Sequence, residues 1–238
     1  MNLRVASANW YYANKQPVRD AHFLVNFDPD IVGVQEGHGG NAQDIKNALK
    51  GTHETFWGKP ADKAKAYGAL DVPVFYKKRL KVIRRWSRQV SKRASVKDLG
   101  MPRAATIVRF EKDGVNVTFV NTHLNAAVQG SAGKPLTAKI KRVFEFIQSI
   151  IVLEAIIRRA QRRGDLVVVV GDMNFRKTNA GVWKFSPIGL FNRTKLNYRE
   201  VGLDYIAFSK RFKASNFKVI PTSQTGSDHP WLLLDLSA

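Results

Sequence analysis

Short apolar runs, separated by polar and turn-forming residues, recur along the whole chain. They are rich in β-branched residues and are bounded by Gly, Pro, Asn and Asp, a pattern typical of β-strands. The predicted strands are Leu3–Ala8, Ile31–Val34, Val72–Tyr76, Thr106–Phe110, Val115–Val120, Leu166–Val170, Tyr205–Phe208 and Trp231–Leu236. Asp113-Gly114 can adopt the positive φ angles of a tight turn, so the two strands that flank it are expected to form an antiparallel hairpin.

Helical periodicity is strongest between Leu136 and Arg163. Apolar residues recur there at the spacing of one helix face, and Gly164 follows as a residue that ends helices. Asp20–Asn26 and Asn41–Leu49 are shorter helix candidates. Many strands with few helices, joined by hairpins and by helical crossovers, predict an α+β fold in which sheets pack face to face.

The length of 238 residues fits one large domain or two small ones. No internal repeat, low-complexity segment or Pro/Gly/Ser-rich linker divides the chain, so a single domain over residues 1–238 is the simpler interpretation. The content of hydrophobic residues is 44%, with 14 Phe and 5 Trp. That is enough for a real core and excludes disorder as a description of the whole chain.

The charge and the lack of cysteine narrow the chemistry. The chain carries 39 Lys and Arg against 19 Asp and Glu, a formal charge of +20. This favours a polyanionic partner, with nucleic acid first and an anionic membrane surface second, while a solubilising surface is the simpler alternative. Because no Cys is present, a metal must bind oxygen or imidazole ligands, which favours hard cations such as Mg²⁺.

Targeting and membrane-spanning segments are not evident in the sequence. The first residues lack the basic end and apolar stretch of a signal peptide. The longest apolar region, Phe144–Ile157, is interrupted by polar residues and is shorter than the ~20 residues that a bilayer span needs. We therefore expect a cytoplasmic monomer without a transmembrane span.

Polar side chains gather at the ends of the predicted strands, where a strand can hold them rigidly beside a cleft. Any one of them alone is more often a turn former, a cap or a satisfied histidine. Together they supply carboxylates for a hard cation, groups that take a proton from water, and donors for developing phosphate charge, as a metal-dependent phosphoester hydrolase needs. The residues concerned are Asn9, Glu36, His123, Asp172, Asn174, Asp204, Asp228 and His229.

In their order along the chain, these motifs resemble the endonuclease/exonuclease/phosphatase superfamily, which includes pancreatic-type deoxyribonucleases, abasic-site endonucleases, inositol-polyphosphate 5-phosphatases and sphingomyelinases. The resemblance covers essentially the whole chain. It implies a four-layer α/β sandwich, two packed mixed β-sheets flanked by helices, with the site at one end. The matching motifs are Asn9, Gln35-Glu36, Asn121-Thr122-His123-Leu124, Gly171-Asp172-Met173-Asn174, Leu203-Asp204-Tyr205-Ile206 and Ser227-Asp228-His229.

The resemblance also implies roles for single residues. Glu36 would be the principal Mg²⁺ ligand, with Asn9 and Asp228 close by and Mn²⁺ as a substitute cation. Asp172 would position or deprotonate the attacking water. Asn174 would bind the scissile phosphate.

The histidines and one arginine carry further implications. His229 would contact the phosphate as an acid or charge stabiliser, with Asp204 accepting from its other ring nitrogen, unless Asp204 is only a turn residue. His123 resembles the deoxyribonuclease branch rather than the abasic-site enzymes, which tend to have tyrosine there. That branch pairs this histidine with a glutamate that has no clear counterpart here, Asp71 being the nearest candidate. Arg103 resembles the family arginine that approaches a substrate phosphate, or is one more charge on a basic face.

A nuclease and a phosphatase are favoured by different features. Arg176, in Asn174-Phe175-Arg176, resembles the first signature of the 5-phosphatases, whereas their second signature, a Pro-aromatic-Cys-Asp-Arg arrangement, is absent. The basic run Lys77–Arg93 could follow a phosphate backbone and stack on bases, or protect an edge strand. Its candidate nucleic-acid-binding residues are Lys78, Arg84, Arg85 and Trp86.

Another basic cluster, Arg158, Arg159, Arg162 and Arg163, lies at the end of the long predicted helix, where interaction with the helix dipole is the simpler account.

These features favour a Mg²⁺-dependent phosphodiesterase, a nuclease that hydrolyses DNA with low sequence selectivity. The alternative is a phosphomonoesterase that acts on inositol phosphates or on other phosphorylated small molecules or lipids. A binding module that keeps the fold without the activity is a third class.

Overall fold

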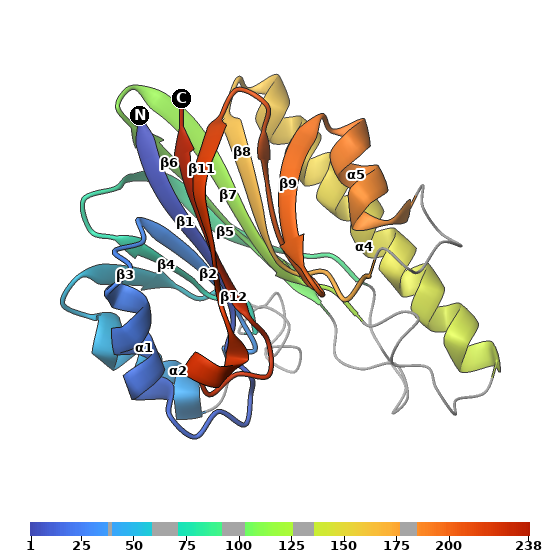
Figure 1. Ribbon diagram of the computed structural model, residues 1–238. Helices are drawn as coiled ribbons and strands as arrows, with labels where there is room; N and C mark the ends of the chain where they lie inside the picture. Colours follow the sequence, from blue (N-terminus) through green and yellow to red (C-terminus); the bar gives the residue numbers. More distant parts are fainter. Residues whose placement is uncertain (38–39, 59–70, 92–102, 126–135, 177–184) are drawn as a thin grey trace.

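Two six-stranded β-sheets pack face to face in the computed structural model, with helices on both outer faces (Figure 1). The structure describes residues 1–37, 40–58, 71–91, 103–125, 136–176 and 185–238. This four-layer arrangement of two mixed sheets flanked by helices confirms the fold class that the sequence predicted.

The first sheet has the strand order β11-β12-β1-β2-β4-β3. Helices α1 and α2 cover its outer face (Figure 1). The bounds are β1 Asn2–Asn9, α1 Pro17–Val25, β2 Ile31–Gln35, α2 Gly40–Leu49, β3 His53–Phe56, β4 Val74–Lys77, β11 Lys213–Ile220, η4 Thr222–Gln224 and β12 Trp231–Ser237.

The second sheet has the strand order β5-β6-β7-β8-β10-β9. Helix α4 packs on its outer face, with α5 beside it. The bounds are β5 Lys81–Gln89, β6 Ala104–Lys112, β7 Val115–His123, α4 Leu136–Arg162, β8 Leu166–Asp172, α5 Pro187–Arg193, β9 Leu196–Val201 and β10 Asp204–Ser209.

Three apolar layers fill the spaces between the four layers of structure. The central one joins the two sheets, with Val5 of β1 and Val168 of β8 among its members. Strand β8 is buried at every position, because the first sheet covers one face and α4 the other. This explains why its sequence is a continuous apolar run rather than an alternation.

The predicted central strands are present, and the β6–β7 hairpin has the expected turn, with φ of 52° at Asp113 and 75° at Gly114. The strands that the sequence analysis did not predict are β3, β5, β9 and β11. These are the edge strands of the two sheets. An edge strand that is half exposed needs no continuous apolar run, so its pattern is weak.

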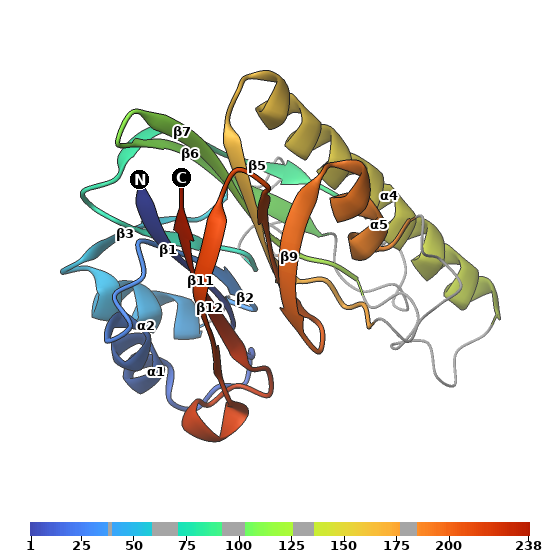
Figure 2. The same ribbon diagram turned by 45° about the horizontal axis from the view of Figure 1, so that its top comes forward.

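The strand directions gather the polar strand ends at one end of the sandwich. Strands β1 and β2 are parallel, as are β7 and β8, whereas β10 and β12 run antiparallel to their neighbours β8 and β1. The last residues of β1, β2, β7 and β8 therefore lie at the same end as the first residues of β10 and β12 (Figure 2). No helix of the described segments is long and apolar enough to cross a membrane.

Candidate active site

The Asp172 carboxylate lies at the centre of the polar cluster. Strand β8 ends at this buried residue, and its Oδ1 accepts the backbone N–H of Asn174 at 2.7 Å. Its Oδ2 accepts from Asn9 Nδ2 at 3.2 Å and lies 3.5 Å from His123 Nε2 and 3.8 Å from His229 Nε2. Two imidazoles thus face one oxygen of this carboxylate. The end of β8, the backbone of the turn to Asn174 and the Asn9 amide hold the carboxylate in place.

The His229 ring is held by Asp204, the first residue of β10. Nδ1 of His229 lies 2.8 Å from Asp204 Oδ2. Burial raises the pKa of Asp204 to about 7, although the His229 hydrogen bond opposes this. Burial lowers the pKa of His229, but the hydrogen bond and negative charge of Asp204 outweigh it and raise that pKa to about 9. The pair therefore retains a proton at neutral pH, beside the Asp172 oxygen.

The His123 ring has its own acidic partner, Asp71. Nδ1 of His123 lies 2.8 Å from Asp71 Oδ2 and 2.9 Å from Nη1 of Arg103. Arg103 donates from Nη1 to Asp71 at 2.7 Å and from Nε to Asn125 Oδ1 at 3.0 Å. The structure thus places the nearest candidate of the sequence analysis against His123. It also assigns Arg103 a contact with this pair, which the sequence did not suggest.

Glu36 follows β2 in the left-handed region, with φ of 57°, and is half-buried. Its Oε2 accepts the backbone N–H of Tyr12 at 2.9 Å. A non-glycine residue at positive φ is strained, and such strain is common at functional sites. The carboxylate at the end of β2 is thereby held against the segment that follows β1.

Asn9 and Asp228, the other predicted ligands, differ in their surroundings. Oδ1 of buried Asn9 accepts a hydrogen bond from the backbone N–H of Tyr11 at 3.1 Å, and Nδ2 of Asn9 donates to Asp172. An amide oxygen has a second lone pair, so Asn9 can still act as an oxygen ligand. Asp228 is exposed beside His229. Two carboxylates and an amide oxygen are the donor set that Mg²⁺ prefers, so the residues fit the implied ion.

Asp172, Asp204 and His229 form a second group that could hold a metal, with one ligand atom of each within 4.8 Å of the others. Asp204 and Nδ1 of His229 already bond to each other at 2.8 Å, as the members of an acid–base pair do. This chemistry suits the group to acid–base work better than to metal binding.

Gln35 and Asn121 lie beneath the site and link the two sheets. Gln35 Nε2 donates to Asn121 Oδ1 at 2.6 Å, and Asn121 Nδ2 donates to the carbonyl oxygens of Val34 and Pro73. Gly33 leaves the space for this contact, because a Cβ there would lie 2.7 Å from Asn121 Oδ1. These amides of the sequence motifs fix the ends of β2 and β7 relative to each other.

A comparison with protein families gives a match to the Endonuclease/Exonuclease/phosphatase family over residues 6–229. The chain belongs to this family. The match covers every polar strand end described above. Family membership establishes a hydrolase of phosphoester bonds, of a kind that is typically dependent on divalent metal.

Solved structures of this family resemble the chain over its whole length. An endonuclease/exonuclease/phosphatase from Bacteroides vulgatus is 20% identical, with a TM-score of 0.72 over 100% of this chain and 99% of that one. TDP2 from C. elegans is 17% identical, with a TM-score of 0.68 over 100% and 76%. A mannosyl-6-phosphatase from Bacteroides thetaiotaomicron is 18% identical, with a TM-score of 0.72 over 99% and 100%. A comparison with curated proteins gave no match.

In this endonuclease/exonuclease/phosphatase chain, Asn174 and Arg176 follow the central carboxylate. Asn174 has φ of 47°, and its Nδ2 donates to the carbonyl oxygen of Leu124 at 2.8 Å. The buried Phe175 separates it from Arg176, which is exposed. Asn174 is therefore fixed beside Asp172, whereas Arg176 projects from the segment after it.

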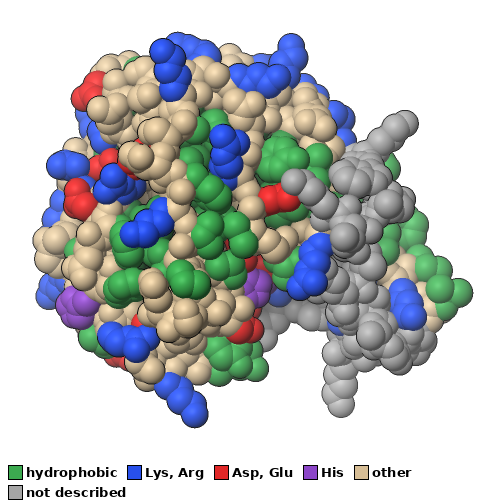
Figure 3. Space-filling model, in the orientation of Figure 1, with side chains coloured by type: hydrophobic (Ala, Val, Ile, Leu, Met, Phe, Trp, Pro, Cys, Tyr) green, Lys and Arg blue, Asp and Glu red, His purple; other side chains and the backbone are tan. Residues whose placement is uncertain are grey.

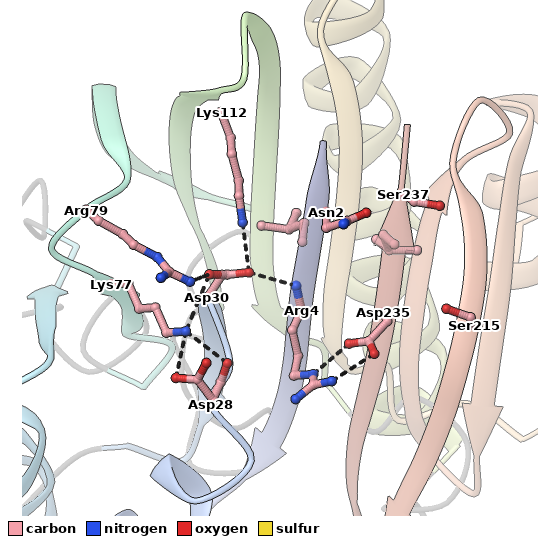
Figure 4. Close-up of a pocket in the computed structure, with 12 residues that line it drawn as sticks. Asn2, Arg4, Asp28, Asp30, Lys77, Arg79, Lys112, Ser215, Asp235 and Ser237 are labelled. Atoms are coloured by element: carbon pink, nitrogen blue, oxygen red, sulfur yellow. Dashed lines mark hydrogen bonds and ion pairs between the residues drawn. The ribbon is translucent and has the colours of Figure 1, made fainter.

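The basic run is divided between distant parts of the molecule. Gly33 of β2 pairs with Val74 and Ile31 with Tyr76, so Lys78 lies beyond the end of β4 that is remote from Glu36. Lys77 and Arg79 pair there with Asp28 and Asp30 in a pocket of mixed charge (Figure 4). Lys92 and Arg93 lie outside the described residues. Lys78 is thus not brought together with the catalytic cluster.

On β5 the predicted binding residues point to two faces. Arg85 Nη1 donates to the Tyr76 hydroxyl at 2.6 Å, and its guanidinium lies 5.5 Å from the centre of the Phe56 ring, both on the first sheet. Arg84 lies 5.3 Å from the centre of the Trp86 ring, and both residues face helix α4. Arg85 therefore bridges the sheets, while Arg84 and Trp86 line the outer side.

Proposed function

We propose that the chain is a Mg²⁺-dependent phosphodiesterase, a nuclease that hydrolyses DNA with low sequence selectivity. The observation that carries the proposal is the Asp172 carboxylate oxygen, with the imidazoles of His123 and His229 at 3.5 and 3.8 Å, each backed by an aspartate. One carboxylate and a histidine that keeps its proton are suited to take a proton from water and to donate one to phosphate.

The residues then have distinct roles. Asp172 orients the attacking water and accepts its proton, while the buried amide of Asn9 keeps the carboxylate in place. His229 presents its Nε2 proton to the phosphate or the leaving oxygen, and Asp204 fixes the ring through Nδ1. Asn174 binds the phosphate. A Mg²⁺ ion held by Glu36, Asp228 and the Asn9 amide oxygen would supply positive charge to the phosphate oxygens.

DNA is favoured as the substrate by charge and by His123. The net charge of +20 attracts a polyanion, and contacts to phosphates carry no base sequence, hence the low selectivity. The His123–Asp71 pair supports the deoxyribonuclease resemblance, in which an acidic residue holds this imidazole. The proposal includes a cytoplasmic monomer, and light scattering in solution measures the oligomeric state.

A phosphomonoesterase is the second candidate. It is favoured by Arg176, which follows Asn174-Phe175 and is exposed, and by the similarity to a mannosyl-6-phosphatase. In that case Arg176 would bind the phosphate of a small substrate, and the positive charge of the molecule would serve an anionic surface.

The test compares the two substrate classes on the same preparation. Supercoiled plasmid is incubated with Mg²⁺ or EDTA, beside an inositol phosphate and mannose 6-phosphate assayed for released phosphate. We expect Mg²⁺-dependent nicking and little phosphate release. An intact plasmid with phosphate released, and loss of that release in Arg176→Gln but not in the exposed control Arg211→Gln, would establish the phosphatase instead.

A further inference from the structure

A groove of about 510 Å³ lies between the edge strand β5 and the C-terminal half of helix α4, which runs across the outer face of the second sheet (Figure 2). Of its lining residues that the structure describes, six are arginines and none is acidic. The arginines are Arg84 and Arg88 of β5, Arg109 of β6, Arg159 and Arg162 of α4, and Arg163 after it.

Most of this charge has no partner among the described residues. Arg109 and Arg163 share the buried carboxylate of Asp165. The side chains of Arg84, Arg88, Arg159 and Arg162 form no hydrogen bond or ion pair with any residue that the structure describes, and the Arg84 guanidinium lies over the Trp86 ring. Within the part of the chain that the structure describes, four guanidinium groups thus line one groove without a neutralising carboxylate, an arrangement that an anion would stabilise.

The helix dipole explains only part of the groove. Arg159 and Arg162 lie in the last turns of α4, where positive charge is favourable. Arg84 and Arg88 reach the same space from a strand, which has no such dipole. Elsewhere, on the face shown in Figure 3, Lys and Arg side chains are scattered among other residues. The helix dipole therefore does not explain why arginines gather on both walls of the groove.

The groove combines cationic and aromatic side chains, the two kinds of group through which proteins bind a single nucleic-acid strand. Arg84, Trp86 and Arg88 alternate along one face of β5, so an aromatic ring lies between two arginines on the same wall of the groove. Arg159 and Arg162 form a second row on the opposite wall. Cationic grooves with aromatic side chains bind single strands through phosphates and base stacking.

We propose that this arginine groove binds a single strand of nucleic acid outside the catalytic centre. The proposal rests on the nuclease function and adds a holding site to it. Through β6, Arg88 lies level with Thr122, one residue before His123, and Arg84 lies level with Thr118. A strand bound along β5 therefore runs toward the catalytic end of the sandwich.

The test removes two charges from the helix wall with Arg159→Gln and Arg162→Gln. The matched control is Lys210→Gln with Arg211→Gln, two exposed residues after β10 with the same change of charge. Binding of a fluorescent 20-nucleotide thymidylate strand is measured by anisotropy in EDTA over a series of salt concentrations. We expect the groove variant to bind at least tenfold more weakly at low salt. The slope of log K against log salt should fall by about 1.4, since each lost phosphate contact removes about 0.7.

Three results would overturn the proposal. In the first, the groove variant binds the strand as the control variant does. In the second, a duplex of the same length competes as well as the single strand. In the third, the groove variant loses binding to phosphatidylserine vesicles and keeps binding to the oligonucleotide.

Failure of the groove proposal can be distinguished from failure of the proposed nuclease function. Hydrolysis of bis(p-nitrophenyl) phosphate with Mg²⁺ is measured on the same proteins, and the groove variant should retain it, because this substrate is too small to span the groove and the catalytic site. If the unmodified protein cleaves neither this diester nor plasmid, the nuclease function is wrong, and the binding data still decide the groove. If it cleaves both while the groove variant binds normally, only the groove is wrong.

Discussion

Asp172 shows how single residues acquire their role from their neighbours. The sequence identifies it by a motif, but its chemistry depends on two imidazoles that come from β7 and from the residues before β12. Each imidazole is in turn oriented by an aspartate, Asp71 or Asp204. The site is therefore a chain of contacts in which the outer carboxylates orient the inner rings.

Asp71 marks the limit of what sequence could predict at this scale. Asp172, Asp204 and His229 stand in motifs, and the structure brings them together. Asp71 has no motif around it and lies 52 residues from His123 along the chain. The sequence offered Asp71 only as the nearest candidate, and the folded register, which places the segment before β4 beside the end of β7, brings the two side chains into contact. The roles of all these residues stay predictions until variants are measured.

The pH dependence of hydrolysis should depend on Asp204. The pKa of His229 is raised to about 9 by its bond to Asp204, so the ring is protonated at neutral pH and loses its proton as the pH rises through 9. Activity should fall along this alkaline limb. Asp204→Asn removes the negative charge that raises the pKa of His229. The alkaline limb of the pH–rate profile, measured with a small diester, should therefore move to lower pH by at least one unit. An unchanged limb would exclude His229 as the acid.

Metal binding should distinguish Glu36 from the Asp204–His229 pair. Glu36→Gln removes the carboxylate that follows β2, where the backbone has a positive φ, and should weaken Mn²⁺ binding at least tenfold. Electron paramagnetic resonance measures this binding. Asp204→Asn should change it less than threefold. The reverse order would move the metal to the group of Asp172, Asp204 and His229.

At the scale of elements, buried strands were predictable and edge strands were not. The continuous apolar run of β8 predicts a strand covered on both faces, as observed. In β5, by contrast, four of the nine residues are basic, and the sequence indicated a basic run rather than a strand with two different faces. Arg85 contacts the first sheet, and Arg84 faces α4. Which face each residue takes depends on a register shift between Val82 and Arg84 that charge patterns do not encode.

Asp165 should stabilise the junction of α4, β6, β7 and β8. Its buried carboxylate accepts hydrogen bonds from Arg109, Thr118 and Arg163. Burial raises its pKa, but these bonds outweigh burial and lower it, so its stabilisation is present above the ordinary pKa of ~3.9 and is lost as the pH falls through the lower folded value. Asp165→Asn should lower the free energy of unfolding at pH 7 by about 1.5–3 kcal/mol.

Urea unfolding at pH 7 and at acid pH measures this effect. The difference in stability between Asp165→Asn and the unmodified protein should shrink as the acid removes the charge. The exposed Asp44→Asn is the control and should change stability by less than ~0.5 kcal/mol. A constant difference at every pH would mean that packing, not charge, is lost.

At the scale of the whole molecule, positive charge serves different purposes in different places. At the end remote from the catalytic cluster, Lys77, Arg79 and Lys112 pair with Asp30, and the Arg4 guanidinium pairs with Asp235 (Figure 4). In the arginine groove between β5 and α4, by contrast, Arg84, Arg88, Arg159 and Arg162 have no acidic partner among the described residues. The net charge alone could not distinguish these cases, because it does not show which cations the fold neutralises.

The central claim is that the Asp172 carboxylate, between two aspartate-backed imidazoles, hydrolyses phosphodiesters. The most direct measurement is the Mg²⁺-dependent rate of plasmid cleavage by Asp172→Asn beside Asp44→Asn. We predict a rate at least 100-fold below that of the unmodified protein for Asp172→Asn, an unaltered rate for Asp44→Asn, and unchanged circular dichroism for both. A folded Asp172→Asn protein that cleaves plasmid at the original rate would contradict the account.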